Sequence, residues 1–178
     1  MGKILQAAGE AIARGGVSKA GVNAIAKQAG VNKVLLYRYF SGWNGLVEGL
    51  FDHILATIHT QATELKVSGS SASIETFAVQ YYQALHTNVA FQVLIRWQMD
   101  NKLTELGQRL GTLQNQFLQQ VGAATRIEAG LIRLLIAGIT HSILTEDKQS
   151  GAESTALTEA VIRSFCVRLA PSETLVTE

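Results

Sequence analysis

The sequence predicts an all-α protein of about nine helices. Along most of its 178 residues, apolar side chains recur every three or four positions, which is the period of a helix buried on one face. The single proline, Pro171, lies near the C-terminus, so the strongest helix breaker is missing from the rest of the chain. Alternating runs of β-branched and aromatic residues, which are typical of strands, do not appear.

Composition favours a cytoplasmic protein without a membrane segment. The one cysteine, Cys166, excludes an internal disulfide and suits a reducing compartment. We expect no signal peptide at the N-terminus. The longest apolar-rich run without a charge, residues 134–145, has twelve residues, whereas a membrane-spanning helix needs about twenty.

The charge is divided unevenly along the chain. Residues 1–50 carry a balance of +4, and the remainder carries a balance of −3. A basic segment on an acidic body indicates a polyanionic partner for that segment alone, although scattered surface lysines would give the same balance. The charged residues of the segment are Lys3, Arg14, Lys19, Lys27, Lys33 and Arg38, against Glu10 and Glu48.

The N-terminal residues predict three short helices, over about 2–14, 19–28 and 32–39. A glycine pair follows the first helix, Ser18 is placed to cap the second, and Gly30 supplies the tight turn before the third. The residues that would close a small core beneath these helices are Ile25, Ala26, Val31, Leu36 and Phe40.

Longer helices are predicted next. The fourth follows Ser41 and reaches about Lys66, a loop at 67–72 precedes a fifth helix that Ser73 can cap, and a sixth spans about 88–98. The apolar stripe of the fourth helix consists of Leu46, Leu50, Ile54, Ile58 and Leu65, with Val47, Phe51 and Leu55 alongside.

Three further helices complete the prediction. A seventh begins at Asp100 or Asn101, and the capping box of Thr125 and Glu128 announces an eighth. The ninth follows the polar stretch 146–154.

The eighth helix predicts a homodimer. It is apolar on most sides over residues 131–143, so it needs cover on two faces, and a thin bundle can provide the second face only through a partner chain. Small residues, among them Gly130, Ala137 and Gly138, let helices approach closely. We therefore expect a two-fold dimer built through the eighth and ninth helices as a four-helix bundle.

Residues 22–40 have the pattern of a helix-turn-helix, in which two short helices are joined by a turn containing glycine. The pattern alone also occurs in ordinary helical bundles. However, the stretch VNAIAKQAGVNKVLLYRYF, followed by SGWNGLVEGLF, resembles the N-terminal domain of TetR-type (tetracycline-repressor-like) regulators, and the resemblance is specific over residues 4–55. The matching elements are Ile25-Ala26, Ala29-Gly30-Val31, Leu36-Tyr37, Phe40 and Leu46.

The resemblance implies an N-terminal three-helix DNA-binding domain over residues 1–45 and an effector-binding and dimerisation bundle over 46–178. It also implies nine or ten helices, with DNA read by the third helix and dimerisation through the last two. The operator would be pseudo-palindromic, as it is for dimeric helix-turn-helix proteins.

The residues expected at DNA follow from the position of the third helix, whose N-terminal residues lie near base edges in the major groove. Lys33 can donate to guanine or to a phosphate, and Asn32 can pair with adenine or simply cap the helix. By resemblance, Tyr37 hydrogen-bonds a phosphate and Tyr39 takes a similar role nearby. The other candidates are Val34, Arg38, Lys19 and Asn23.

The chain also departs from the family pattern. Val34 and Leu35 stand where the family commonly has a small residue and then Thr or Ser, and Trp43 replaces a phosphate-binding lysine at the start of the fourth helix. Apolar side chains at these positions can touch thymine methyl groups but lose hydrogen bonds. We therefore expect a modest DNA affinity or an operator rich in A·T pairs.

No metal, cofactor or catalytic site is expected. His53 and His59 are six residues apart on one helix and do not face together, His86 and His141 are isolated, and the lone cysteine has no CxxC partner. No nucleophile elbow, phosphate-binding glycine loop or acid pair stands out, so we do not expect an enzyme.

The effector candidates come from an aromatic cluster on the fifth and sixth helices, because ligand pockets are mainly apolar with a few polar groups. Ordinary core packing is the alternative for each residue. Arg96 and Arg133 can pair with an anionic effector or extend into solvent. The cluster consists of Tyr81, His86, Phe91 and Trp97, with Tyr82 and Met99 beside them.

These observations predict a DNA-binding transcriptional regulator, a repressor that a small-molecule effector releases from its operator. The alternative is a helical ligand-binding or scaffold protein with a degenerate helix-turn-helix, which Leu35 and Trp43 would explain. A small α-bundle enzyme is disfavoured by the absence of a catalytic constellation.

Overall fold

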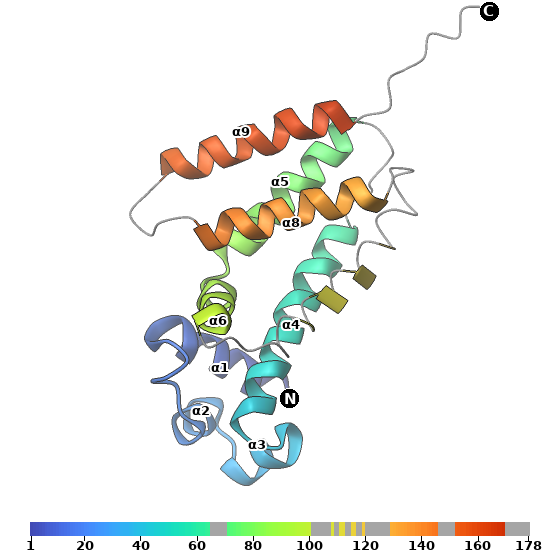
Figure 1. Cartoon of the computed structure of the whole chain (residues 1–178). Coiled ribbons are helices and arrows are strands. Elements are labelled where there is room, and N and C mark those ends of the chain that lie inside the picture. The colour runs from blue at the N-terminus through green and yellow to red at the C-terminus, as the bar shows by residue number, and fades with distance from the viewer. Residues whose placement is uncertain are drawn as a thin grey trace, which may run out of the picture. The chain divides into compact units, whose positions relative to one another are not determined.

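A computed structural model describes residues 1–64, 71–100, 129–145 and 152–169, together with isolated positions between 108 and 119. Within these residues all regular structure is helical, which confirms the predicted all-α class (Figure 1). The predicted seventh helix is described only at those isolated positions, and the capping box of Thr125 and Glu128 lies outside the described residues. The helices are α1 (Gly2–Gly15), α2 (Val22–Ala29), α3 (Lys33–Phe40), α4 (Trp43–Glu64), α5 (Ser71–Thr87), α6 (Val89–Asp100), α8 (Ala129–Thr145) and α9 (Ala152–Leu169).

The chain divides into two compact units. The first comprises residues 1–58 and 86–113, and the second comprises residues 59–85 and 114–178. Helix α4 therefore begins in the first unit and ends in the second. The domain boundary after residue 45 stays a prediction.

In the first unit, α1 packs against α2 and α6, and α2 packs against α3. A Cβ atom added at Gly9 would lie 3.6 Å from Leu50 Cδ1 and 4.0 Å from Ala90 Cβ, so α1 passes close to α4 and α6 at this glycine. The rings of Phe51 and Phe91 stack with their centroids 6.0 Å apart. Leu46, Leu50, Ile54 and Ile58 are buried, as the stripe predicted for the fourth helix requires.

Two predicted helix starts are wrong. Helix α2 begins at Val22 with Gly21 at its N-cap, so Ser18 does not cap it. Ser18 lies instead in a turn in which the backbone N–H groups of Lys19 and Ala20 donate to the carbonyl of Gly16. The turn is held because Val17 is buried, which the spacing of polar residues did not reveal. Helix α5 begins at Ser71, two residues before the predicted cap at Ser73.

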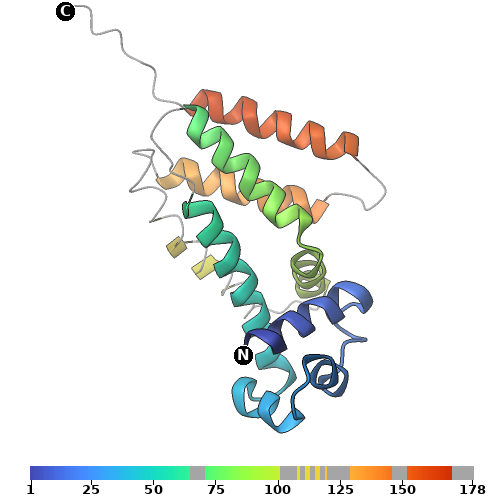
Figure 2. The same ribbon diagram turned by 180° about the vertical axis from the view of Figure 1, so that it is seen from behind.

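In the second unit, α8 packs against α9, and α5 crosses both helices (Figure 2). Two polar contacts connect α5 to α9: Arg163 pairs with Glu75, and Gln83 Nε2 donates to Glu159 Oε1 over 2.8 Å. The buried apolar residues of α8 lie on one side of the helix, and they are Ile132, Leu135, Ile136, Ile139 and Ile143.

The opposite side of α8 is uncovered in the single chain. Leu134 is 64 % exposed, and on α9 Leu157, Val161 and Phe165 are exposed as well. The sequence predicted cover on both sides of α8, and cover of this face by a second chain stays a prediction. None of the helices in the described ranges is long and apolar enough to cross a membrane.

Candidate nucleic-acid interface

The turn between α2 and α3 has helix-turn-helix geometry. Gly30 has φ 67 and ψ 32, in the left-handed region that glycine adopts at no steric cost. The backbone N–H of Val31 donates back to the carbonyl of Ala26 over 3.0 Å, which closes the end of α2. The chain then reaches Asn32 in an extended conformation, and α3 begins at the next residue. This confirms the turn that Gly30 predicted.

Asn32 is the N-cap of α3. Its side-chain Oδ1 accepts a hydrogen bond from the backbone N–H of Val34 over 2.9 Å. A cap of this kind satisfies one of the free N–H groups at the start of a helix. Of the two interpretations left open by the sequence, the structure shows the cap, and that hydrogen bond occupies the oxygen that a bidentate contact with adenine would also need.

Helix α3 buries one narrow side and exposes the rest. Leu36 and Phe40 are buried, whereas the other side chains from Lys33 to Tyr39 are exposed. Because residues four apart are neighbours on a helix, the exposed side chains form three rows. The outer rows pair Lys33 with Tyr37 and Leu35 with Tyr39. The central row, opposite the buried side, pairs Val34 with Arg38.

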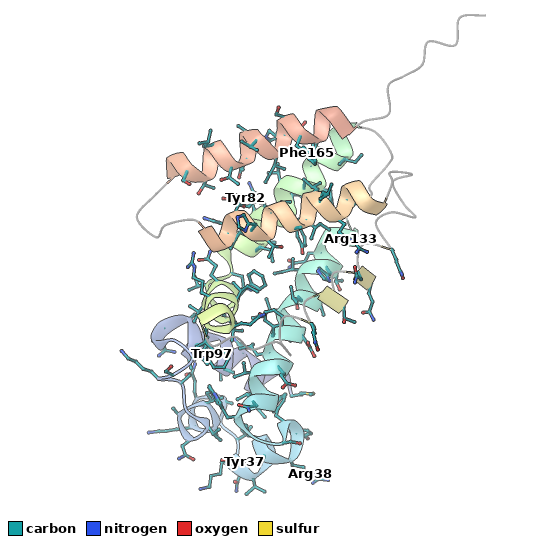
Figure 3. All side chains as sticks on the ribbon, in the orientation of Figure 1. Tyr37, Arg38, Tyr82, Trp97, Arg133 and Phe165 are labelled. Carbon is teal, nitrogen blue, oxygen red and sulfur yellow. The ribbon has the colours of Figure 1, made fainter. Side chains whose placement is uncertain are left out.

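The exposed surface of α3 therefore combines positive charge with phenol groups. Figure 3 shows Tyr37 and Arg38 on the outer side of α3. Neither Lys33 nor Arg38 forms an ion pair with any described residue, so both charges are available to an anion. Lys19 and Asn23, the secondary candidates, are also exposed.

The acidic side chains of α1 and α4 do not oppose this surface. Glu10 on α1 accepts hydrogen bonds from Gln6 and from Gln28 of α2, over 3.2 and 2.6 Å. Glu48 is half-buried on α4. Helices α2 and α3 themselves carry three basic residues, Lys27, Lys33 and Arg38, and no acidic residue.

The corner between α3 and α4 depends on glycine. Ser41 has φ 54 and caps the end of α3, with its backbone N–H donating to the carbonyl of Tyr37 over 2.9 Å, and Gly42 has φ 112. A Cβ atom at Gly45, inside α4, would lie 1.8 Å from the backbone oxygen of Phe40. Gly45 was not among the residues predicted to shape this domain. A glycine inside a predicted helix was the available signal, because it costs about 1 kcal/mol relative to alanine and usually has a packing reason.

Trp43 is the first residue of α4 and is half-buried. It stands where the family commonly places a phosphate-binding lysine, and its indole N–H is the only donor it can offer there. The phosphate contacts expected from Tyr37, Tyr39 and the exposed basic residues stay predictions.

The effector candidates fall into different surroundings. Tyr81 lies in the second unit, is 1 % exposed, and stacks on Phe77 and on His59 with centroid distances of 6.0 Å to each. Its hydroxyl lies 3.4 Å from His59 Nε2. Burial lowers the pKa of His59 from 6.5 to about 4, so this imidazole is neutral at physiological pH.

His86, Phe91 and Trp97 lie in the first unit. Phe91 is fully buried against Phe51, and the backbone carbonyl of His86 accepts a hydrogen bond from the side chain of Gln92. Trp97 is half-buried (Figure 3). The contact of Tyr81 with His59 was not predicted, because residues 22 positions apart on different helices leave no signal in a single sequence.

The remaining candidates are less confined. Arg133 is exposed on α8 (Figure 3). Arg96 is half-buried and Tyr82 is fully buried. The side chain of Met99 lies outside the described residues. In the part of the chain that is described, no three His, Cys, Asp or Glu side chains gather as metal ligands.

The N-terminal helices resemble a known family in sequence. Residues 4–50 match the family model described as bacterial regulatory proteins of the tetR family. No curated protein sequence matches the chain.

Solved structures extend the likeness to the rest of the chain. A transcriptional regulator from Streptomyces coelicolor has a TM-score of 0.71 at 18 % identity, over 93 % of this chain and 96 % of its own. The TetR-family regulator PfmR from Thermus thermophilus has a TM-score of 0.65 at 16 % identity, over 94 % and 96 %. FadR from Bacillus subtilis, solved with stearoyl-CoA, has a TM-score of 0.64 at 17 % identity, over 93 % and 96 %.

At these identities the solved structures establish a common fold, while the match over residues 4–50 rests on the sequence itself. Residues 4–50 are therefore similar in sequence to the bacterial regulatory proteins of the tetR family, and the chain shares its fold with solved transcriptional regulators such as PfmR.

Proposed function

We propose that this protein is a cytoplasmic homodimer that represses transcription from a pseudo-palindromic operator and is released by a small-molecule effector. The observation that carries the proposal is the outer surface of α3, where Lys33, Arg38 and two tyrosines are exposed and the two cations form no ion pair with a described residue. A helix of this composition, held by a capped N-terminus and a glycine turn, is suited to the major groove.

The roles within the interface follow from chemistry. Lys33, in the first turn of α3, is placed to donate to guanine or to an adjacent phosphate. Tyr37 and Tyr39 lie on opposite outer rows of the helix, so their hydroxyls can reach phosphates on either side of the groove. Arg38 and, from the preceding turn and helix, Lys19 and Asn23 add contacts that position the protein without reading sequence.

DNA binding is tested by its salt dependence and by two substitutions. Affinity for a duplex selected from a random library should fall with salt at a log–log slope near −0.9 for each phosphate contacted. Lys33→Ala should change which sequences are preferred, whereas Tyr37→Phe should weaken all sequences by a similar factor. Lys3→Ala, which removes an exposed lysine of α1, is the matched control and should leave sequence preference unchanged.

A flat salt dependence would refute DNA binding and favour the alternative function, a helical ligand-binding or scaffold protein. Leu35 and Trp43, which depart from the family pattern, would explain such a loss of DNA binding. In that case ligand binding should persist while no duplex is preferred over any other.

The proposed dimer uses the uncovered face of α8 and α9. An apolar groove of about 240 Å³ runs along this face, and Leu157 at 68 % exposure and Val161 at 62 % stand beside it. Gly138 is exposed, and a Cβ atom added there meets nothing within 4 Å in the single chain. The groove is lined by Leu134, Leu135, Gly138, Ile139, Ser142, Thr158, Val161, Ile162 and Phe165.

Gly138→Arg tests the dimer without disturbing the protomer, because the single chain has space for the new side chain. The variant should sediment as a monomer, or aggregate, where the unaltered protein sediments as a dimer. Gln80→Arg on α5 adds the same charge at another exposed helical position and should remain dimeric. A monomeric mass for the unaltered protein at micromolar concentration contradicts the proposal.

For the effector we propose an apolar or aromatic small molecule. The FadR neighbour is solved with stearoyl-CoA, so a protein of this fold can hold a long apolar ligand. The proposed contacts stay those expected from the sequence, considered within each unit: Tyr81 in the second unit, and His86, Phe91 and Trp97 in the first. In the second unit, the neutral His59 beside Tyr81 adds a polar group that needs no counter-ion.

A Trp43→Phe variant leaves Trp97 as the only tryptophan and is the protein to screen. Stearoyl-CoA and a panel of aromatic compounds should include one that changes Trp97 fluorescence and raises the melting temperature. The same compound should change operator affinity, because coupling between two binding sites is reciprocal. A screen in which no compound does both would identify a regulator that binds its operator constitutively.

A further inference from the structure

We propose that Val34 and Leu35 read the C5-methyl groups of thymines, so that the operator half-site carries thymine at the two base pairs that face them. This inference rests on the proposed function and names the kind of sequence that α3 selects. It concerns the two positions at which the chain departs from the family pattern.

The exposure of these side chains is the first observation. Val34 is 63 % exposed and Leu35 is 36 % exposed, whereas Leu36, the next apolar residue of α3, is fully buried. Four of the eight other large apolar side chains exposed in the described residues belong to the face of α8 and α9 that the dimer would cover, and they are Leu134, Leu157, Val161 and Phe165. Burial in the core therefore does not explain the apolar character of Val34, and over a third of the surface of Leu35 is free as well.

Their position on α3 is the second observation. Val34 lies in the central row of the exposed side with Arg38, directly opposite Leu36 and Phe40. Tyr37 lies to one side of this row and Tyr39 to the other, so two phenols that suit phosphates flank it. A helix set in the groove with its tyrosines toward the two backbones directs Val34 toward base edges. Leu35 lies on the row of Tyr39, one turn earlier, where the start of the helix brings it to the edge of a neighbouring base.

The rigidity of the helix start is the third observation. Asn32 Oδ1 holds the backbone N–H of Val34 at 2.9 Å, and the Gly30 turn fixes the chain before it. Val34 has a β-branched side chain with few rotamers. The side chain is thus held in place before DNA binds.

The chemistry then selects the base. In the major groove, guanine, adenine and cytosine present hydrogen-bonding groups, and thymine alone adds a methyl group. A valine or leucine side chain has no donor or acceptor, so over any other base edge it displaces water without replacing the lost hydrogen bonds. Apolar contact with a thymine methyl group is the one favourable match.

Deoxyuridine provides the test, because it lacks the methyl group of thymine and keeps the same hydrogen-bonding groups. We would select a duplex from a random library with the full-length protein and then replace each thymine by deoxyuridine in turn. The selected half-site should contain thymines at two neighbouring base pairs, and replacing either one should weaken binding about fourfold, the value of one buried methyl group. Symmetric replacement in both half-sites should weaken binding about 15-fold.

The variants Val34→Ala and Leu35→Ala assign each thymine to its side chain. Both residues are exposed, so both variants should keep the circular dichroism spectrum and melting temperature of the unaltered protein. Val34→Ala should abolish the deoxyuridine effect at one position and leave the other unchanged, and Leu35→Ala should do the converse.

Retention of the full deoxyuridine effect in both variants, or its absence in the unaltered protein, would overturn this inference while sequence-selective binding continued to support the proposed function. Failure to select any preferred duplex would instead refute the proposed function itself. The two failures are therefore distinguishable in one experiment.

Discussion

Replacing Gly45 by alanine tests the geometry of the corner that joins the reading helix to α4. The added Cβ atom would lie 1.8 Å from the backbone oxygen of Phe40, the last residue of α3. Carbon–oxygen contacts in proteins are rarely shorter than about 3.3 Å, so the backbone must separate by roughly 1.5 Å. No rotamer change can relieve the clash, because both groups are held by backbone.

The expected cost follows from these distances. Overpacking a site costs about 1–3 kcal/mol, and a backbone clash belongs at the upper end of this range. Alanine recovers at most about 1 kcal/mol because it favours helix more than glycine does. The net loss of about 2 kcal/mol should lower the melting temperature by roughly 4–8 °C. Since α3 must shift, affinity for the operator should fall as well.

Gly9→Ala is the matched control. Its Cβ atom would meet Leu50 Cδ1 at 3.6 Å, which is ordinary van der Waals contact inside a helix of the same unit. This variant should gain roughly 0.5–1 kcal/mol and melt about 1–4 °C higher. Thermal unfolding followed by far-UV circular dichroism, at one fixed protein concentration, compares the three proteins. If Gly45→Ala is as stable as Gly9→Ala, the described approach of Phe40 to α4 is wrong.

Three further results are expected. Burial lowers the pKa of His59 from 6.5 to about 4, so the unfolded chain binds more protons than the folded chain between these two pH values. Stability that is present above pH 6.5 should therefore be lost as the pH falls towards 4, by at most about 3 kcal/mol. Urea titrations should show a smaller loss for His59→Gln, and an equal loss would assign the pH dependence to other groups. Burial raises the pKa of Cys166 to about 11, and the charge of Glu75 is the second, smaller cause. At pH 8 only about a thousandth of this thiol is thiolate, so a disulfide reagent should react fast only after denaturation. Rapid reaction of the native protein would show that α9 does not bury this thiol. Asn32→Ala should lower the free energy of unfolding by about 1 kcal/mol, because the N-cap of α3 is lost. Asn32→Ser should keep both the cap and the operator preference. A changed operator preference in Asn32→Ser would show that Asn32 reads a base.

The sequence was sufficient where local signals decide the structure. Gly30 predicted the turn because a left-handed residue is needed there, and the spacing of Leu46, Leu50, Ile54 and Ile58 predicted the buried side of α4. These features depend on neighbours within one or two helical turns. A single sequence carries that information directly.

The sequence was insufficient where the outcome depends on distant parts of the chain. Ser18 has the chemistry of a helix cap, but burial of Val17 holds it in a turn. This turn lies three residues before Gly21, the actual N-cap of α2. The contact between Tyr81 and His59 joins different helices, and no spacing rule reports it. Gly45 could be predicted in part. The sequence shows a glycine inside a predicted helix, but the need for glycine comes from the close approach of the Phe40 backbone, which the sequence does not show.

The departures of α3 from its family and the uncovered face of α8 and α9 are connected through the energetics of DNA recognition. Each mismatched base pair costs roughly 1–3 kcal/mol, whereas a specific site must exceed non-specific DNA by about 4–10 kcal/mol. One α3 offers Lys33 and two apolar contacts, and a methyl contact belongs at the low end of that range. A single helix would therefore reach at most the low end of this difference, and the two helices of the proposed dimer would reach about twice as much because well-separated positions add. Separating the protomers, as Gly138→Arg is designed to do, should reduce the preference for operator over random DNA to about its square root and halve the salt slope. The apolar face of α8 and α9 would then be as necessary for reading sequence as the side chains that touch the bases.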